Sequence, residues 1–214
     1  SEFVDPILAA AAADPELFEI AARVSILHRT DLAGFKSLAA LPAPDQETRR
    51  KSLFMLAGLC PAADLLAASR SLNAEPVFME GLLNSLTSEN RILSQRSDPI
   101  QLRAIADGIL QLARIRLDLN KPDAAIAATA ALPEIEEVVG DLHGLNTVRL
   151  QAWLCLGRLD EATKLDVVFE DWLTALARCP LPDQAVEINS TLAARFGLTA
   201  EQKAVLDKAA RRTP

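Results

Sequence analysis

The residues best suited to chemistry in this chain are its three cysteines, its two histidines and a few adjacent carboxylates. His28 and His143 lie far apart, and no C-x-x-C or H-x-x-x-H spacing supplies the clustered ligands of a zinc site. A nucleophilic Cys155 or Cys179 would need a histidine beside it in space. Cys179 precedes Pro180 at an expected helix end, which favours a structural role. The sequence therefore predicts no metal-ligating residue among them.

The carboxylates and glycines also lack a catalytic arrangement. Glu136–Glu137 and Glu170–Asp171 are adjacent pairs, and neighbours on a helix do not face each other, so we expect solvated faces rather than an acid and a base. The segment GDLHG at 140–144 does not match a phosphate-binding loop. We therefore predict a protein that is not an enzyme, with no catalytic residue and no cofactor.

The cysteines also bear on the compartment. An odd number of widely spaced cysteines in apolar surroundings argues against a disulfide framework. Cys60, Cys155 and Cys179 are therefore expected as buried, reduced thiols. This favours a cytoplasmic location, and a periplasmic one is the alternative if a signal peptide once preceded the opening SEF.

Composition and charge exclude several classes of protein. The net charge of -7 is spread evenly along the chain, which argues against binding to nucleic acid because such binding depends on clustered Lys and Arg. No apolar run approaches the roughly 20 residues that a membrane-spanning helix needs. Aromatic residues make up 4% of the chain and Tyr is absent, so Leu, Ala, Ile and Val must fill the core, which favours helices. The predominance of Arg over Lys, together with abundant Ala, is typical of a GC-rich bacterial source.

Adjacent Asp and Pro residues punctuate the chain at regular intervals and predict helix starts. Asp at an N-cap accepts bonds from free backbone N–H groups, and Pro suits the first helical position. We predict helices over 5–13, 15–28, 31–40, 45–59, 61–70, 75–87, 89–96, 98–120, 141–157, 159–179, 182–196 and 199–212. No segment has the alternation of a strand.

The predicted helix over 159–179 has the clearest apolar stripe. The most polar connection, over 85–99, is our candidate boundary between an N-terminal helical array over 1–96 and a C-terminal array over 97–214. The same segment could equally be one short helix inside a single continuous domain.

A short phrase recurs along the chain. LNKPDAAI begins at Leu119 and LGRLDEAT begins at Leu156, a step of 37 residues, and LHRTDLA at 27–33 has the same skeleton. In the first two phrases a small residue leaves the first helix, a base follows it, an acid starts the second helix and an alanine lets the helices approach. These residues are Asn120 and Gly157, Lys121 and Arg158, Asp123 and Asp160, and Ala125 and Ala162. Periods of roughly 30 to 45 residues indicate stacked helix pairs.

These phrases resemble the inter-helix segment of the tetratricopeptide (TPR) repeat. The resemblance covers about 98–179, and 27–42 more weakly. The step of 37 residues departs from the family's usual period of about 34, and the family's aromatic and small pair is missing from 106–119, with Trp153 alone echoing it later. The resemblance implies an all-α, helical-repeat array (α-solenoid, TPR-like) of antiparallel helix pairs; an unrelated helical bundle with the same turn chemistry is the alternative.

The resemblance also implies a function and a binding surface. Members of this family commonly hold a peptide or a partner helix in a groove lined by the first helix of each pair. Counting back from Asn120 and Gly157 places Asp107, Arg114, Thr147 and Gln151 on that side. An arginine there could clamp a partner carboxylate through two parallel bonds, although ordinary solvated charge is the simpler interpretation.

We therefore expect a protein–protein interaction scaffold, such as an adaptor, chaperone or assembly factor, that binds another protein or peptide. Two alternatives stay open: a regulatory helical domain of a larger enzyme or regulator, and an oligomerisation module in which exposed Leu-rich stripes close a homo-oligomer.

Overall fold

The computed structural model describes residues 10–28, 45–71 and 75–211, and every regular element in these ranges is a helix. The predicted all-α class is therefore confirmed. The helix predicted over 31–40, most of the helix over 5–13 and the phrase LHRTDLA fall wholly or largely outside the described residues.

The helices of the first half follow the predicted segments closely. They are α2 (Pro15–His28), α4 (Gln46–Leu59), α5 (Ala62–Ser71), α6 (Pro76–Asn84) and α7 (Glu89–Ser94). Asp14, Asp45 and Asp98 cap helices as expected, because each carboxylate accepts bonds from backbone N–H groups in the following turn.

The helices of the second half include α8, the longest of the described helices. They are α8 (Pro99–Asp118), α9 (Pro122–Ala128), α10 (Leu132–Val139), α11 (Leu145–Cys155), α12 (Leu159–Ala162), α13 (Phe169–Arg178), α14 (Ala185–Phe196) and α15 (Ala200–Ala210). Asp123 and Asp160 lie in the first turns of α9 and α12, one position inside their expected place as the starting residue. There they still favour the positive end of the helix dipole.

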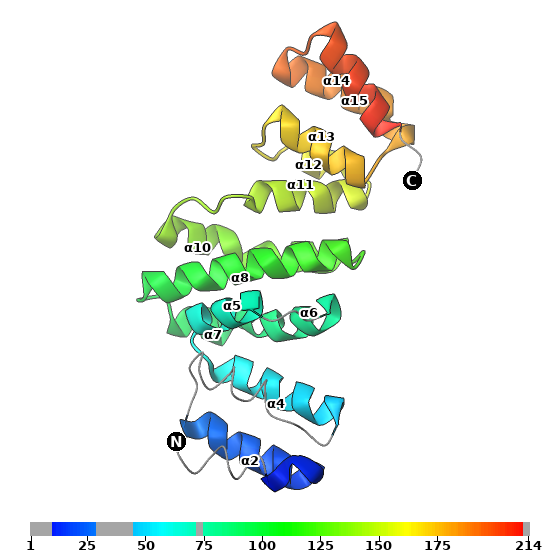
Figure 1. The fold of residues 1–214 in the computed structure, drawn as a ribbon. Coiled ribbons are helices and arrows are strands. Elements are labelled where there is room, and N and C mark those ends of the chain that lie inside the picture. Colours follow the sequence, from blue (N-terminus) through cyan, green and yellow to red (C-terminus); the bar gives the residue numbers. More distant parts are fainter. Residues whose placement is uncertain (1–9, 29–44, 72–74, 212–214) are drawn as a thin grey trace.

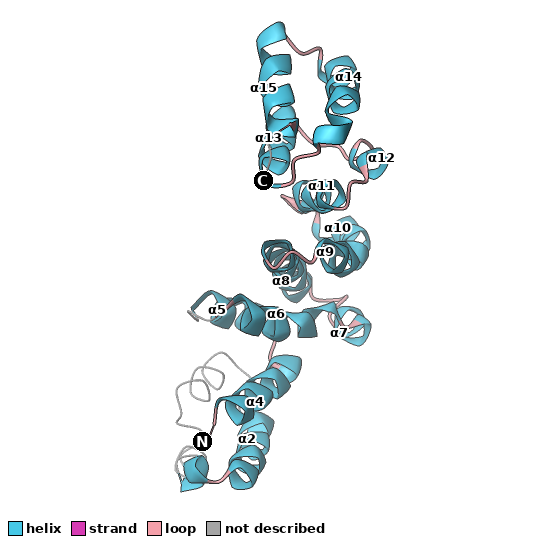
Figure 2. Ribbon diagram, turned by 90° about the vertical axis from the view of Figure 1, so that its right-hand side faces the viewer, coloured by secondary structure: helices cyan, strands magenta, loops and turns pink. Residues whose placement is uncertain are grey.

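The helices stack one above another in an elongated molecule, with α2 at one end and α15 at the other (Figure 1). α8 packs on α5 and α6 on one side and on α9, α10 and α11 on the other, and α11 packs in turn on α13. Figure 2 shows α8 and α13 on one side of the stack, and α9, α12 and α14 on the other.

The two matching corners have the same backbone geometry. Asn120 and Gly157 both adopt positive φ angles, 56° and 68°. The N–H group of Asn120 bonds the carbonyl three residues back at 2.9 Å, and the N–H group of Lys121 bonds the carbonyl five residues back at 2.7 Å; Gly157 and Arg158 repeat both bonds, each at 2.9 Å. This is the Schellman arrangement that ends a helix with a left-handed residue. Ala125 and Ala162 are fully buried.

The apolar core forms two clusters that meet on α11. The first contains residues from Ala11 to Ala152, and the second contains residues from Leu150 to Ala210. The first cluster crosses residue 97, because α8 packs directly on α5 and α6. A domain boundary at 96/97 stays a prediction, and the described core is continuous there.

The single helix predicted over 159–179 is wrong, because α12 ends at Ala162 and α13 begins at Phe169. Between them Val167 turns inward to a buried position. Arg195 donates to the carbonyl oxygens of Thr163 at 3.0 Å and Leu165 at 2.8 Å, so carbonyls released by the break keep a donor. Trp172 and Leu176 of the predicted apolar stripe are buried, but the helices that α13 packs on, α11 and α15, could not be recognised from spacing.

The prediction of three reduced thiols is also wrong. Cys155, the last residue of α11, forms a disulfide with Cys179, which follows α13, with their Cα atoms 5.0 Å apart. Cys60 is buried as predicted. The two bonded cysteines meet because α11 and α13 pack side by side, a long-range fact that a separation of 24 residues does not reveal.

Candidate interaction face

The four predicted binding residues lie on two helices that pack together. Asp107 and Arg114 lie on α8, and Thr147 and Gln151 on α11. Arg114 is exposed and the other three are half-buried, so all four side chains are within reach of solvent. The structure therefore brings these residues onto neighbouring helices, while their binding role stays a prediction.

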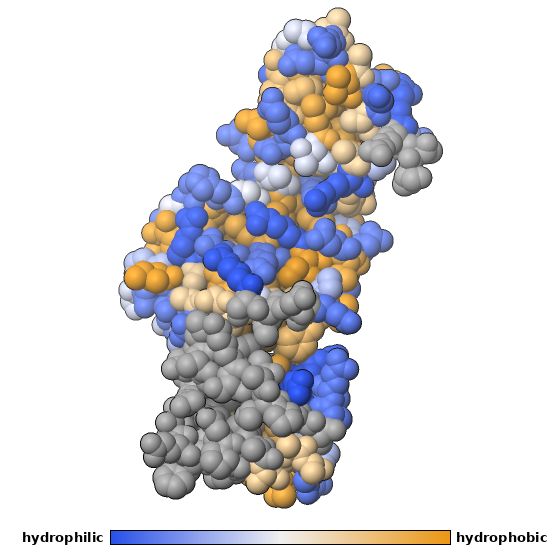
Figure 3. All heavy atoms as spheres, in the orientation of Figure 1, coloured by the Kyte–Doolittle hydropathy of each residue, from blue (hydrophilic) through white to orange (hydrophobic). Residues whose placement is uncertain are grey.

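These residues belong to a larger surface that we call the polar face. It consists of Arg103, Asp107, Arg114 and Asp118 on α8, Thr147, Gln151 and Cys155 on α11, and Arg178 and Cys179 at the end of α13. In the orientation of Figure 1, hydrophilic residues gather over α8 and α11 (Figure 3). The C-terminal ends of the three helices lie on the same side, since Asp118 pairs with Arg178 and Cys155 with Cys179.

Both acids of α8 on this face already have a cationic partner. Asp107 lies 3.3 Å from Nε of Arg103, whose Nη1 also donates to the carbonyl oxygen of Asp141 at 2.9 Å. Asp118 lies 3.7 Å from Nη1 of Arg178. Each carboxylate of α8 on this face thus has a cation of the same chain within ion-pair distance.

Arg114 differs from these pairs. It forms no hydrogen bond or ion pair with any residue that the structure describes. A Cβ placed on Gly144 would lie 2.7 Å from Nη2 of Arg114, so the guanidinium lies against the backbone at the start of α11. Gly144 also has a φ of +88°, which a side chain would strain. Because Gly144 has no side chain, the guanidinium of Arg114 fits against this backbone, and it does so without an acidic partner among the described residues.

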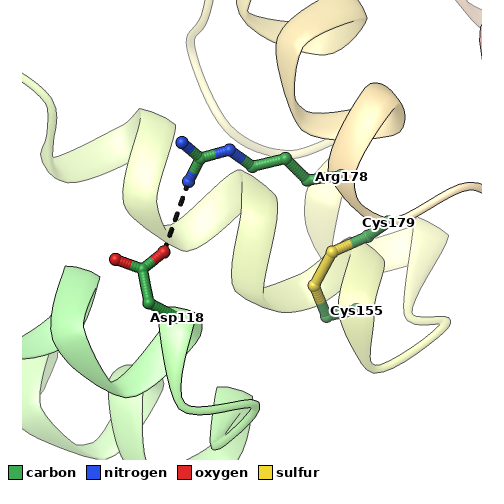
Figure 4. The surroundings of a disulfide bond; sticks show 4 residues. All are labelled: Asp118, Cys155, Arg178 and Cys179. Atoms are coloured by element: carbon green, nitrogen blue, oxygen red, sulfur yellow. Dashed lines mark ion pairs between the residues drawn. A yellow bond between two sulfur atoms is a disulfide. The ribbon is translucent and has the colours of Figure 1, made fainter. Parts of the chain in front are cut away.

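Arg178 and Cys179 are parts of the face that the sequence analysis missed. Figure 4 shows Arg178 reaching across α11 to Asp118, with the disulfide beside it. Both residues belonged to the far end of the single helix expected over 159–179, and no spacing rule placed that end beside α8. A pairing of α11 with α13 would have been the necessary signal.

Two hollows elsewhere in the described residues are built around structural arginines. One of about 740 Å³ lies between the α4–α5 corner and the start of α8. There Arg91 donates to the carbonyl oxygens of Ala57 and Cys60, and burial lowers the pKa of Arg91. The other, of about 550 Å³, contains Arg195, which the break before α13 already uses. Each guanidinium is thus committed to backbone carbonyls.

The histidines and acids show no cluster in the described ranges that could hold a metal ion. His143 lies in the turn before α11, not in its first helical turn, and its Nδ1 is 2.7 Å from Oδ2 of Asp141. The side chain of His28 lies outside the described residues. Among the described helices none combines the length and the apolar character needed to cross a bilayer.

Comparisons with known proteins were made on the whole chain. No family model matches it, and no curated protein and no solved structure is significantly similar to it.

Proposed function

We propose that this protein is an interaction scaffold, and that it binds a peptide or helix of another protein on the polar face. The observation that carries this proposal is the exposed guanidinium of Arg114, unpaired among the described residues, between two acids that are already paired. Charged groups without an internal partner on a rigid surface are available to an external one.

The chemistry of the face suggests what the partner presents. A carboxylate, from an acidic side chain or a chain terminus, would accept a bidentate pair of hydrogen bonds from the guanidinium of Arg114. Thr147 and Gln151 lie along the same side of α11 as Gly144 and could bond the partner's backbone. We expect an adaptor, chaperone or assembly factor, and we propose a TPR-like helical repeat as its architecture, supported by the matching corners at Asn120 and Gly157.

Quantitative capture of partners from the source cell tests the proposal. We expect Arg114→Glu to reduce recovery of the main captured protein by at least about tenfold, since it removes an attraction and adds a repulsion. Lys203→Glu is the control, because Lys203 is also an exposed cation and lies on α15, which contributes no residue to the polar face. If Arg114→Glu and the parent capture the same proteins equally, the proposal fails.

A second candidate function, oligomerisation, rests on exposed apolar residues near one side of α8. Leu93, Ile100 and Val138 are 53%, 74% and 46% exposed. Leu93 and Val138 border the same small cleft between α7 and α10. Light scattering that finds a dimer in the parent and a monomer in Leu93→Glu would favour this function.

A further inference from the structure

The disulfide lies within the polar face and joins two of its three helices. Cys155 is exposed at the end of α11, and Cys179 is half-buried after α13. Arg178, the residue next to Cys179, crosses α11 to Asp118 of α8 (Figure 4). The covalent bond and the ion pair therefore fix the same end of α13 to the same end of the face.

Besides the disulfide and the ion pair, α13 is held by apolar packing along its length and by a hydrogen bond near its N-terminal end. Trp172, Ala175 and Leu176 are buried in the second apolar cluster, which also takes Leu150 and Leu154 of α11. At the opposite end of α11, Nδ2 of Asn146 donates to the carbonyl oxygen of Asp166 at 3.1 Å. Breaking the disulfide would therefore leave α13 packed but loosen its C-terminal end.

The ion pair cannot hold that end alone. Its charged atoms are 3.7 Å apart, and the side chains of Arg178 and Asp118 are 59% and 65% exposed. Pairs this exposed contribute little free energy because water and salt screen them. A hydrogen bond also ties the segment after α13 to the end of α11, because Nε2 of Gln184 donates to the carbonyl oxygen of Gly157 at 3.2 Å. The bond between Cys155 and Cys179 is the covalent attachment at this end, so the position of Arg178 depends mainly on it.

We propose that the Cys155–Cys179 disulfide is a thiol-sensitive latch: its redox state determines whether the C-terminal end of α13 is held in place at the polar face. Oxidised, it holds α13 against α11 and keeps Arg178 over Asp118. Reduced, it lets the end of α13 move away, leaves the carboxylate of Asp118 without its cationic partner and loosens the surface that the partner protein binds. This inference rests on the proposed function for its consequence, but not for the movement itself.

The reaction is a thiol–disulfide exchange with a dithiol, the co-reactant that the latch requires. One thiolate of the dithiol attacks the sulfur of the exposed residue Cys155 and forms a mixed disulfide, while Cys179 leaves as a thiolate and takes a proton. The second thiolate of the dithiol then displaces Cys155, which also takes a proton. The protein disulfide gains two electrons and two protons, and the dithiol becomes a disulfide.

Hydrogen exchange of the whole chain with and without dithiothreitol tests the movement. We expect amides of α13 to exchange about tenfold faster or more after reduction, because the loop that the bond closes is no longer constrained. Amides in the middle of α8 should keep their rates. The double variant Cys155→Ser, Cys179→Ser should exchange like the reduced parent in both conditions.

The chain offers a matched thiol control. Cys60→Ala removes the buried third thiol and leaves the disulfide in place, so it should respond to dithiothreitol as the parent does. Iodoacetamide should label two cysteines of the reduced, folded parent and none of the oxidised one. Equal protection of α13 in the oxidised and the reduced parent would overturn the latch.

Partner capture separates this inference from the proposed function. If Arg114→Glu abolishes capture but reduction leaves it unchanged, the face binds and the latch does not regulate it. If reduction releases α13 while neither reduction nor Arg114→Glu affects capture, the proposed function fails. A fall in capture on reduction, absent from the double serine variant, supports both.

Discussion

Asn120 and Gly157 both adopt the left-handed backbone conformation, and each can do so for a different reason. Glycine lacks a Cβ atom and adopts positive φ freely, whereas asparagine is among the few other residues that tolerate it. Each residue lets its helix end in the same two backbone bonds, after which the chain turns into the next helix. The direction of two helix pairs therefore depends on one residue in each corner.

This dependence predicts a stability difference between two glycines. Gly157→Ala should lower the free energy of unfolding by roughly 1 kcal/mol, because alanine strains a φ of +68°. Gly58→Ala is the control: a Cβ meets nothing within 4 Å at either position, but Gly58 lies inside α4 with ordinary helical φ. It should stabilise the protein by up to about 1 kcal/mol. Urea denaturation measures both, and equal effects would contradict the corner argument.

Glu80 on α6 ties the first corner to the preceding helices. Its carboxylate accepts from Nζ of Lys121 at 2.6 Å and from Nε of Arg116 at 3.2 Å. The hydrogen bond from Lys121 lowers the pKa of Glu80, and the one from Arg116 acts in the same direction, against the cost of burial. Arg116 also bonds Asn84 at 2.7 Å, so this small network holds α6, α8 and the corner together.

The Glu80 network predicts a pH dependence of known sign. Because folding lowers this pKa below the ordinary 4.5, the stabilisation is complete above that pH and disappears as the pH falls through the folded-state value. Glu80→Gln should cost about 1 kcal/mol at pH 7. The difference in unfolding free energy between parent and variant should shrink towards zero below pH 4.5. A difference that stays constant from pH 7 to pH 3 would show that charge is not the cause.

At the scale of elements, three arginines donate hydrogen bonds to backbone carbonyl oxygens at or after helix ends. Arg91 reaches the end of α4, Arg149 donates to the carbonyl oxygen of Thr129 after α9 at 2.8 Å, and Arg195 reaches the segment after α12. Burial lowers the pKa of Arg149, as it does for Arg91, yet both guanidinium groups keep backbone oxygens as partners. A planar group with five donors suits this task better than lysine.

Arg195 gives a test of that role. Arg195→Ala should lower the free energy of unfolding by about 1–2 kcal/mol, because the carbonyl oxygens of Thr163 and Leu165 lose their donor. Arg211→Ala serves as the control, since Arg211, the residue after α15, pairs with Asp207 one turn earlier and its side chain is 51% exposed. That change should stay within about 0.5 kcal/mol. Equal losses in urea denaturation would refute a capping role for Arg195.

These contrasts explain which features the sequence could predict. The corners at Asn120 and Gly157 and the caps at Asp45 and Asp98 are local, because a few adjacent residues determine them. The break before α13 and the disulfide depend on residues that meet through packing of separate helices. On the polar face, Arg114 was found by counting back from its corner, whereas Arg178 required the position of α13.

At the scale of the whole molecule, α11 belongs to two cores at once. Val148 and Ala152 face the first cluster, and Leu150 and Leu154 face the second. Stacked helices contact mainly their neighbours, so such molecules can open locally at one end while the rest stays folded. The polar face spans the junction, which makes its shape sensitive to the relative stability of the two clusters.

Two leucines that are fully buried in different clusters test this division. Leu154→Ala should destabilise the second cluster by about 2–5 kcal/mol through the cavity it leaves. Hydrogen exchange should then accelerate in α13, α14 and α15, while α5 and α6 keep their protection. Leu112→Ala, within the first cluster, should accelerate α5, α6 and α8. Should both variants accelerate every helix equally, the chain would unfold as one cooperative unit, and α11 would be an ordinary core helix rather than a junction.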